Sequence, residues 1–104
     1  MTRLHALDWK TVPRAPVLPP GALHLWKIAT AGQRTPSADK LWPLLSAPEM
    51  ERAGRLRLEL HRGRYLRAQG GLRKILASYM DRRPEALVFL RGGAGKPYLK
   101  DNPL

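Results

Sequence analysis

The chain has 104 residues, of which 43% are hydrophobic and 26% charged, so its length and composition fit one small globular domain with a thin core. It contains no cysteine, which excludes disulfides, thiolate metal sites and cysteine nucleophiles. No apolar run approaches the ~20 residues that span a bilayer, and the N-terminus lacks the apolar core of a signal peptide, so we expect a cytoplasmic protein without a membrane partner. Nineteen Lys and Arg residues against eight Asp and Glu give a net charge of +11, which attracts anions.

Residues 1–21 are predicted to form an irregular, proline-rich arm that precedes one α/β lobe over residues 22–104. Proline fixes φ and removes a backbone donor, so a run of prolines disfavours regular structure. The prolines of the arm are Pro13, Pro16, Pro19 and Pro20.

The lobe is predicted to open with a strand over residues 22–30, in which apolar side chains alternate onto both faces. Residues 31–40 contain turn-forming residues and predict a loop. The short apolar run 41–45, interrupted by Pro43, is typical of one helical turn packed on the core.

Ser46, Pro48 and Glu49 predict the start of a helix. The Ser46 hydroxyl can accept from the amide of Glu49 while the Glu49 side chain reaches back, and Pro48 costs little in the first turn. We expect this helix to run from about Ala47 towards Leu60.

A second helix is predicted from Arg64 to Met80, after a break at Gly63. Its apolar residues recur at spacings of three and four and predict one buried stripe: Tyr65, Leu66, Leu72, Ile75, Leu76 and Tyr79. Gly70 and Gly71 each weaken a helix by ~1 kcal/mol relative to alanine, so their presence indicates close approach by another backbone.

The C-terminal part of the chain predicts a hairpin, with strands over residues 87–90 and 96–99 and a glycine-rich turn at 91–95. The order strand, helix, helix, hairpin predicts the α+β class. We expect a small antiparallel sheet that carries the helices on one side.

Basic residues are concentrated in the two predicted helices. They are Arg52, Arg55, Arg57, Arg62, Arg64, Arg67, Arg73 and Lys74. They cannot all share one helical face, so some belong to solvated faces, while as a group they could line a phosphate site. The residues alone leave both interpretations open.

The turn Gly92–Lys96 has the glycines of a phosphate-binding loop but not its spacing. The GxxxxGK[ST] pattern is absent, and Pro97 stands where Ser or Thr would bind magnesium. The turn therefore indicates either a flexible hairpin connection or a place where Lys96 lies beside an anion.

The titratable residues form no catalytic or metal-binding pattern. His5, His24 and His61 are isolated in the sequence and lack metal-ligand spacing, and no carboxylates are spaced for magnesium or for acid–base work. We therefore assign no catalytic residue and no metal ligand.

Five short motifs follow one another in a fixed order. They are Ser46–Glu49 ahead of an arginine-rich helix, Arg64–Ala68, Leu72–Leu76, Leu87–Phe89 and Gly95–Leu99. No single motif is specific, but the ordered set resembles the N-terminal half of Sfp-type 4'-phosphopantetheinyl transferases, over roughly residues 22–104.

Members of that family transfer 4'-phosphopantetheine from coenzyme A to a serine of a carrier protein and require magnesium. They are pseudo-dimers of two similar α/β lobes, with coenzyme A in the cleft between them. The resemblance implies that this chain corresponds to one lobe. It assigns Arg64 to the 3'-phosphate of coenzyme A, and Gly95, Lys96 and Pro97 to the nucleotide end.

The family's Asn-x-Ser-His-Ser strand, its Gly-x-Asp-x-Glu magnesium motif and its Trp-x-x-Lys-Glu catalytic helix have no counterpart before Leu104. The resemblance thus implies a truncated lobe that is inactive alone and binds coenzyme A weakly. Such a lobe exposes an apolar face, so we expect a homo-oligomer or a missing second lobe.

The alternative is a small basic nucleic-acid-binding or interaction module. The charge permits it, but Trp9, Trp26 and Trp42 lie upstream of the basic cluster, whereas binding of single strands interleaves aromatic and basic residues. We therefore expect no nucleic-acid partner.

Overall fold

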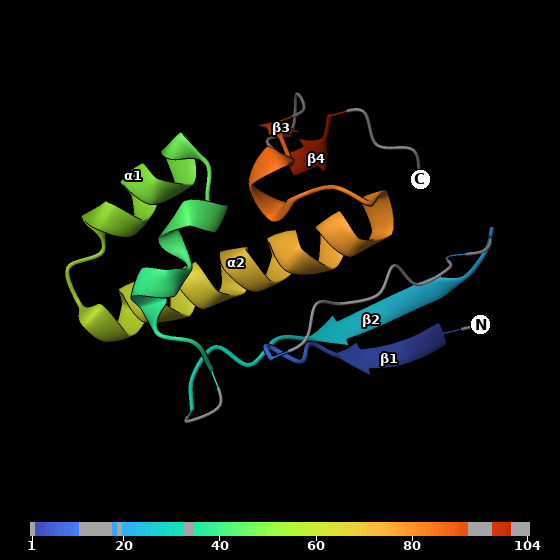
Figure 1. The fold of residues 1–104 in the computed structure, drawn as a ribbon, viewed down its shortest axis with the longest axis horizontal. Helices are drawn as coiled ribbons and strands as arrows, with labels where there is room; N and C mark the ends of the chain where they lie inside the picture. Colours follow the sequence, from blue (N-terminus) through green and yellow to red (C-terminus); the bar gives the residue numbers. More distant parts are fainter. Residues whose placement is uncertain (1, 11–17, 19, 33–34, 92–96, 101–104) are drawn as a thin grey trace.

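The computed structural model describes residues 2–10, 18, 20–32, 35–91 and 97–100. The helices are α1 (Ala47–Arg55) and α2 (Glu59–Met80), and the strands are β1 (Thr2–Ala6), β2 (Leu23–Lys27), β3 (Phe89–Arg91) and β4 (Pro97–Leu99). The long helix α2 crosses the middle of the molecule, with β1 and β2 on one side and the β3–β4 hairpin on the other (Figure 1). The predicted α+β class is confirmed.

The strands form two separate two-stranded sheets rather than one antiparallel sheet. β3 and β4 are antiparallel, as predicted, with Phe89 opposite Leu99. β1 and β2 are parallel, with Leu4 opposite Leu25, and the amide of Leu7 extends the ladder by donating to the carbonyl of Lys27 at 2.9 Å.

The prediction of an irregular arm is therefore wrong for residues 2–6, which form β1. The prolines that suggested irregular structure all follow this strand, so they do not interrupt its hydrogen bonds. The division into an arm and a lobe stays a prediction.

Two short 3-10 helices connect β2 to α1. The second, Trp42–Leu44, confirms the helical turn predicted at residues 41–45, whereas the first, Ala38–Lys40, lies in a segment predicted as loop. Leu41 between them is 2% exposed, so this connection supplies part of the core.

Helix α1 begins as predicted because its first turn is capped reciprocally. The Glu49 amide donates to the Ser46 hydroxyl, and the Glu49 carboxylate accepts from the Ser46 amide at 2.9 Å. The predicted end towards Leu60 is wrong, because α1 ends at Arg55 and Leu56 is extended.

The predicted break at Gly63 is also wrong, since α2 already begins at Glu59 and contains Gly63 as a buried residue. The connection between the helices is closed by Arg62, which donates to the carbonyl of Leu56 at 2.8 Å. A Cβ at position 63 would lie 2.9 Å from Nη1 of Arg67, so Gly63 leaves room for that guanidinium.

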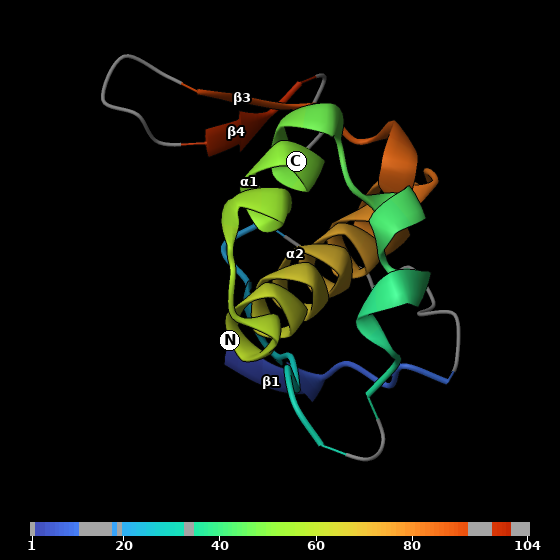
Figure 2. The ribbon, with the colours of Figure 1, turned by 90° about the vertical axis from the view of Figure 1, so that its left-hand side faces the viewer.

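Side chains pack around α2 from several directions, so the single predicted stripe is only partly correct. Leu66 and Ile75 are buried, but Leu72 is 37% exposed. One core cluster surrounds Leu66 and includes Leu41, Leu45 and Ala53; a second consists of Ala77, Met80 and Leu87. Figure 2, a view turned by 90°, shows α1, the 3-10 helices and both two-stranded sheets placed around α2.

The adjacent glycines of α2 admit neighbouring side chains rather than the neighbouring backbone that we predicted. A Cβ on Gly70 would lie 3.2 Å from Leu41, and a Cβ on Gly71 would lie 2.7 Å from Ile28 and 3.1 Å from Trp9. These contacts join the middle of α2 to both the 3-10 segment and the end of the β1–β2 sheet.

Within the part of the chain that the structure describes, no helix combines the length and the apolar character that a bilayer crossing requires.

Candidate functional site

A cavity of about 500 Å³ lies where the start of α1, the middle of α2 and β3 meet. The residues that line it are Ser46, Pro48, Glu49, Arg52, Tyr65, Gln69, Leu72 and Phe89. Three of them, Tyr65, Gln69 and Leu72, follow one another at helical spacings of four and three and present one face of α2 to the cavity.

The cavity brings together four of the five sequence motifs. Ser46 and Glu49 come from the first motif, Tyr65 and Leu72 from the two motifs on the second helix, and Phe89 from the strand motif. The fifth motif adjoins them through the hairpin, because Phe89 pairs with Leu99 of β4. Segments far apart in the sequence therefore converge on one concave surface.

Arg73 is buried on α2 next to the lining residue Leu72, and its hydrogen bonds hold together the elements that form the cavity. Its Nε donates to Oε1 of Glu49 at 2.7 Å, and its Nη1 donates at 2.8 Å to the carbonyls of Pro84 and Leu87. The guanidinium also lies 5.0 Å from the ring centroid of Phe89. One charged side chain thus fixes the first turn of α1 and the start of the hairpin relative to α2.

Glu49 is consequently committed to the fold. Its Oε1 accepts from both the Ser46 amide and Arg73, and its side chain is only 15% exposed. Both hydrogen bonds go to the same oxygen, so the fold fixes the orientation of this carboxylate and pairs its charge with that of Arg73.

The polar groups that remain for a ligand come from Arg52 and Gln69. The Arg52 guanidinium lies 5.8 Å from the ring centroid of Tyr65 and is exposed, so its donors face solvent at the mouth of the cavity. A guanidinium beside an amide and an aromatic ring suits a planar or phosphorylated ligand.

The four residues that the resemblance assigns to coenzyme A binding do not lie together in the described structure. Arg64 is exposed on α2, next to Tyr65 but outside the cavity lining. Pro97 is the first residue of β4 and pairs with Arg91. Gly95 and Lys96 lie outside the described residues.

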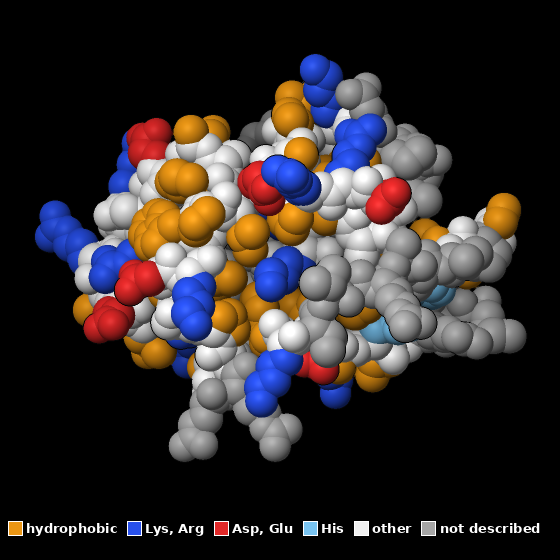
Figure 3. Space-filling model, viewed as in Figure 1, with side chains coloured by type: hydrophobic (Ala, Val, Ile, Leu, Met, Phe, Trp, Pro, Cys, Tyr) orange, Lys and Arg blue, Asp and Glu red, His pale blue; other side chains and the backbone are white. Residues whose placement is uncertain are grey.

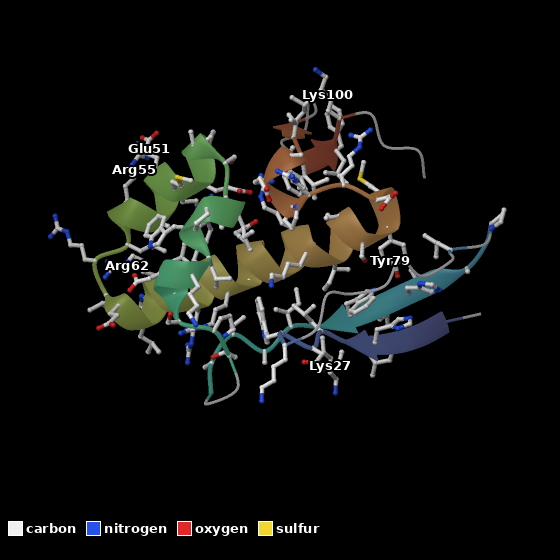
Figure 4. All side chains as sticks on the ribbon, in the orientation of Figure 1. Lys27, Glu51, Arg55, Arg62, Tyr79 and Lys100 are labelled. Carbon is white, nitrogen blue, oxygen red and sulfur yellow. The ribbon has the colours of Figure 1, made fainter. Side chains whose placement is uncertain are left out.

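Most of the arginine series has structural partners. Arg67 donates to the carbonyls of Pro36 and Thr30, at 2.9 and 3.2 Å, and Arg55 pairs with Glu51 on the outer side of α1 (Figure 4). Lys74 lies 5.7 Å from the ring centroid of Trp9. Of the basic residues grouped as a possible phosphate site, only Arg52 lines the cavity, and Arg64 directly precedes its lining residue Tyr65 on α2.

The sequence analysis did not single out Gln69, and it named Arg73 only as a possible phosphate contact and not as a buried residue of the fold. A signal for Arg73 exists: it falls on the periodic series Leu66, Gly70, Arg73, Ala77 and Met80, all of which are buried. An arginine at a position of this spacing is expected inside the protein and must find acceptors there.

A second, slightly larger cavity of about 580 Å³ lies at the carboxyl ends of β1 and β2. Three of its lining side chains form local hydrogen bonds: Trp9 Nε1 donates to the carbonyl of Ala29, Asp8 accepts from the Lys10 amide, and Thr35 donates to the carbonyl of Gly32. It combines none of the motifs, so the cavity beside α1 is the better candidate despite its smaller volume.

The described residues contain no group of three or more His, Cys, Asp or Glu side chains that could hold a metal ion.

The three tryptophan rings pack against other residues of the chain. Trp26 stacks on His5 with ring centroids 4.7 Å apart, and Trp9 and Trp42 pack against the core. These rings do not form an open stacking platform for bases.

Comparison with known proteins finds similarity to one curated enzyme over part of its length. No family model matches the chain, and no solved structure matches it. The 4'-phosphopantetheinyl transferase HetI of Nostoc sp. (strain PCC 7120 / SAG 25.82 / UTEX 2576) is 35% identical over 79 residues. This chain is similar to a 4'-phosphopantetheinyl transferase. The alignment covers 76% of the chain but 33% of the relative, so the chain spans about a third of the relative's length.

Proposed function

We propose that this chain is a lobe of the 4'-phosphopantetheinyl transferase family that binds the nucleotide end of coenzyme A in the cavity between α1, α2 and β3. The observation that carries the proposal is that four motifs of the resemblance, separate in sequence, contribute residues to one cavity. The identity to a protein of that name supports the same family.

The residues suited to the ligand are basic or aromatic. Arg52 supplies guanidinium donors at the mouth, Gln69 supplies an amide and Tyr65 supplies an aromatic wall. We assign Arg64, which precedes Tyr65 on α2, and Lys96, which precedes β4 in the sequence, to the phosphates, because guanidinium and ammonium groups match phosphate oxygens. We assign Gly95 and Pro97, its neighbours in the sequence, to the nucleotide end as well.

Magnesium, which the family requires, does not fit the residues described here. The cavity's carboxylate, Glu49, is held by Arg73 and by the Ser46 amide, and no three-ligand group exists among the described residues. We therefore propose no catalytic residue on this chain and derive no step through a metal ion.

Transfer to a carrier protein then requires a second lobe, either on the same polypeptide or on another one. Apolar side chains near the cavity are available for such a partner: Leu72 is 37% exposed, and Leu90 and Tyr98, which pair across the hairpin, are 38% and 53% exposed. We propose that a second lobe or a second copy covers this region, and that the chain alone does not modify a carrier protein.

Calorimetry with coenzyme A tests the binding proposal. We expect binding that Arg52→Ala or Arg64→Ala weakens by about five- to thirtyfold, because a charge-assisted hydrogen bond at a partly exposed site contributes roughly 1–2 kcal/mol. Arg57→Ala, an exposed arginine in the connection between the helices, is the matched control and should bind as the unmodified chain does.

The same titration with 3'-dephospho-coenzyme A identifies the group that is recognised. If Arg64 contacts the 3'-phosphate, removing that phosphate should abolish the difference between Arg64→Ala and the unmodified chain. The proposed site would be contradicted if Arg52→Ala and Arg64→Ala bound coenzyme A as tightly as Arg57→Ala does, or if the unmodified chain did not bind it.

Sedimentation and mass spectrometry test the need for a second lobe. Incubation with coenzyme A, magnesium and a carrier protein should leave the carrier mass unchanged, and modification by this chain alone would overturn that expectation.

Sedimentation measures whether copies of the chain associate. If they associate through the hairpin, Leu90→Glu should weaken the association, while Leu60→Glu, on another surface, should not.

A further inference from the structure

Four aromatic rings lie together between the β1–β2 sheet and the C-terminal part of α2. They are the side chains of His5, His24, Trp26 and Tyr79, and Figure 4 shows Tyr79 pointing from α2 towards the sheet. The His5 ring stacks on Trp26, with centroids 4.7 Å apart and planes 18° apart, and its centroid lies 4.9 Å from that of His24. Two imidazoles on neighbouring strands thus lie side by side in this interface.

The hydroxyl of Tyr79 joins the sheet to the helix by hydrogen bonds. Trp26 Nε1 donates to it at 3.0 Å, and His24 Nδ1 lies 2.6 Å from it. An indole nitrogen can only donate, so the hydroxyl oxygen accepts from Trp26 and its own proton is free to bind Nδ1. We assign His24 the tautomer in which Nδ1 is the acceptor, because this arrangement gives the hydroxyl proton an acceptor. A protonated His24 would instead aim a second donor at the same oxygen.

The environment of His5 also fits the neutral imidazole. Among the described residues, its Nε2 is the one buried side-chain polar atom without a hydrogen-bond partner. A neutral ring can keep a bare lone pair at this nitrogen, whereas an imidazolium carries a charged N–H there and needs an acceptor for it. His5 forms no ion pair with a carboxylate in the described part of the chain.

The charged and titratable groups around this pair add to the same preference. Each imidazole faces the other, α2 contributes the phenol of Tyr79, and the register position opposite His24 is that of Arg3. Lys27 points away from α2 (Figure 4). Two imidazolium rings with centroids 4.9 Å apart would repel each other, in a chain that already has a net charge of +11.

A separate contact holds the sheet further back along α2. Residues that follow the two strands pack on Gly71, where a Cβ would lie 2.7 Å from Ile28 and 3.1 Å from Trp9. Gly71 and Tyr79 are eight residues apart, which is ~12 Å along a helix. Loss of the ring contacts would therefore free the sheet at the end of α2 and leave it attached at Gly71.

Protons can reach the rings in the folded protein. His5 and His24 are only partly buried, and Figure 3 shows histidine side chains, in pale blue, at the molecular surface beside the sheet. Imidazole is the side chain that ordinarily titrates between about pH 5 and 8. The cluster can therefore respond to pH without prior unfolding.

We infer that His5, His24, Trp26 and Tyr79 form an acid-sensitive latch that holds the β1–β2 sheet on α2. With both imidazoles neutral, the ring stack and the Tyr79 hydrogen bonds keep the sheet in place. Because the closed cluster favours the neutral rings, its stability is full at high pH and is lost as the pH falls through the range in which imidazole titrates. The sheet then separates from the end of α2, on the side of the helix away from the proposed coenzyme A cavity (Figure 1).

Hydrogen exchange followed by mass spectrometry tests the latch on the full chain at about pH 7.5 and about pH 5.5, with rates corrected for the chemical effect of pH. A two-stranded sheet is marginal without a surface to pack on, so opening exposes the amides of β2. Opening binds one proton to each exposed imidazole, whose ordinary pKa is about 6.5, and thus becomes about tenfold more favourable per histidine between these two pH values. We expect β2 protection to fall by about ten- to a hundredfold, whereas amides of α2 around Leu66 keep theirs.

Two variants remove the titration and keep the packing. His5→Phe preserves a ring on Trp26, and His24→Asn offers an amide oxygen to the Tyr79 hydroxyl. Each should show a smaller fall in β2 protection than the unmodified chain, and the double variant should show none. His61→Asn, at an exposed histidine near the start of α2, is the matched control and should respond as the unmodified chain does. Circular dichroism at the higher pH checks that all variants are folded.

The unmodified chain decides the proposal even where a variant does not fold. Equal corrected protection of β2 at the two pH values would overturn it, and so would an equal loss of protection in α2 around Leu66, which would indicate global acid unfolding. A full pH response in the folded double variant would also overturn it. A response that persists in His61→Asn and disappears in the double variant would support the latch.

Discussion

Arg73 shows how strongly one side chain can determine this fold. It is fully buried, and its donors are shared between Glu49 on α1 and two carbonyls of the segment that leads into β3. Removing a buried charge leaves its partners without compensation, which is more costly than the net contribution of the pair itself.

We expect Arg73→Met to lower the free energy of unfolding by about 3 kcal/mol or more, since methionine fills part of the space but pairs with neither Glu49 nor the carbonyls. Urea denaturation followed by circular dichroism measures the change. Arg82→Ala, at an exposed position, should change stability by less than about 0.5 kcal/mol. A loss below 1 kcal/mol for Arg73→Met would show that the buried network contributes little.

Gly71 offers a second test at the scale of one residue. Alanine normally stabilises a helix by up to ~1 kcal/mol relative to glycine, but a Cβ here would lie 2.7 Å from Ile28 and 3.1 Å from Trp9. We expect Gly71→Ala to destabilise the protein by about 1–3 kcal/mol, because overpacking outweighs the gain in propensity.

Gly54 provides the control for that prediction, because a Cβ there meets no atom within 4 Å. Gly54→Ala should be neutral or stabilising by up to about 1 kcal/mol. Thermal unfolding of both variants measures the contrast, and stabilisation by Gly71→Ala would mean that the sheet moves to accommodate the methyl group.

At the scale of elements, interactions between close neighbours in the sequence were predictable. The capping motif at Ser46 and Glu49 placed the start of α1 correctly because both partners lie within one turn. The end of α1 and the start of α2 were not predictable in the same way, because the connection at Leu56 is fixed by Arg62, six residues away, and by packing rather than by a breaking residue.

The pairing of β1 with β2 is the clearest limit of local reasoning. Thr2 lies opposite Leu23, and nothing within β1 itself indicates a parallel partner across a proline-rich segment. The order of the motifs in the sequence predicted which segments contribute to the candidate site. The cavity itself was not predictable, because Gln69 and Phe89 line the same cavity only as a result of tertiary packing.

The capping motif also gives a prediction at this scale. Ser46→Ala should lower stability by about 1 kcal/mol, because one amide at the start of α1 loses its acceptor. Ser37→Ala is the matched control, since Ser37 precedes the first 3-10 helix without a side-chain capping bond, and it should change stability by less than about 0.5 kcal/mol. Equal effects in urea denaturation would contradict a specific role for the cap.

At the scale of the whole molecule, charge is the dominant feature. A net charge of +11 on 104 residues makes the folded surface repel itself, and dissolved ions screen that repulsion over about 10 Å at 0.1 M salt. The exposed pair of Arg55 and Glu51 is weakened by the same ions but contributes little.

We therefore expect the melting temperature to rise by a few degrees between about 20 mM and 300 mM sodium chloride, because relief of general repulsion exceeds the loss of one surface pair. Differential scanning calorimetry at the two concentrations measures the shift. Arg55→Ala should follow the same trend, and a fall in melting temperature with salt would show that attractive pairs dominate the surface.

The network around Arg73 has a consequence for synthesis on the ribosome. Its acceptors at Pro84 and Leu87 are made after the whole of α2, so for a time the guanidinium has only Glu49 as a partner within the described network. Burying it before those carbonyls emerge would leave donors unsatisfied in an apolar setting. We therefore expect the core around Arg73 to close only when the segment that leads into the hairpin is available, so that the wall of the proposed ligand cavity and the core behind it form together.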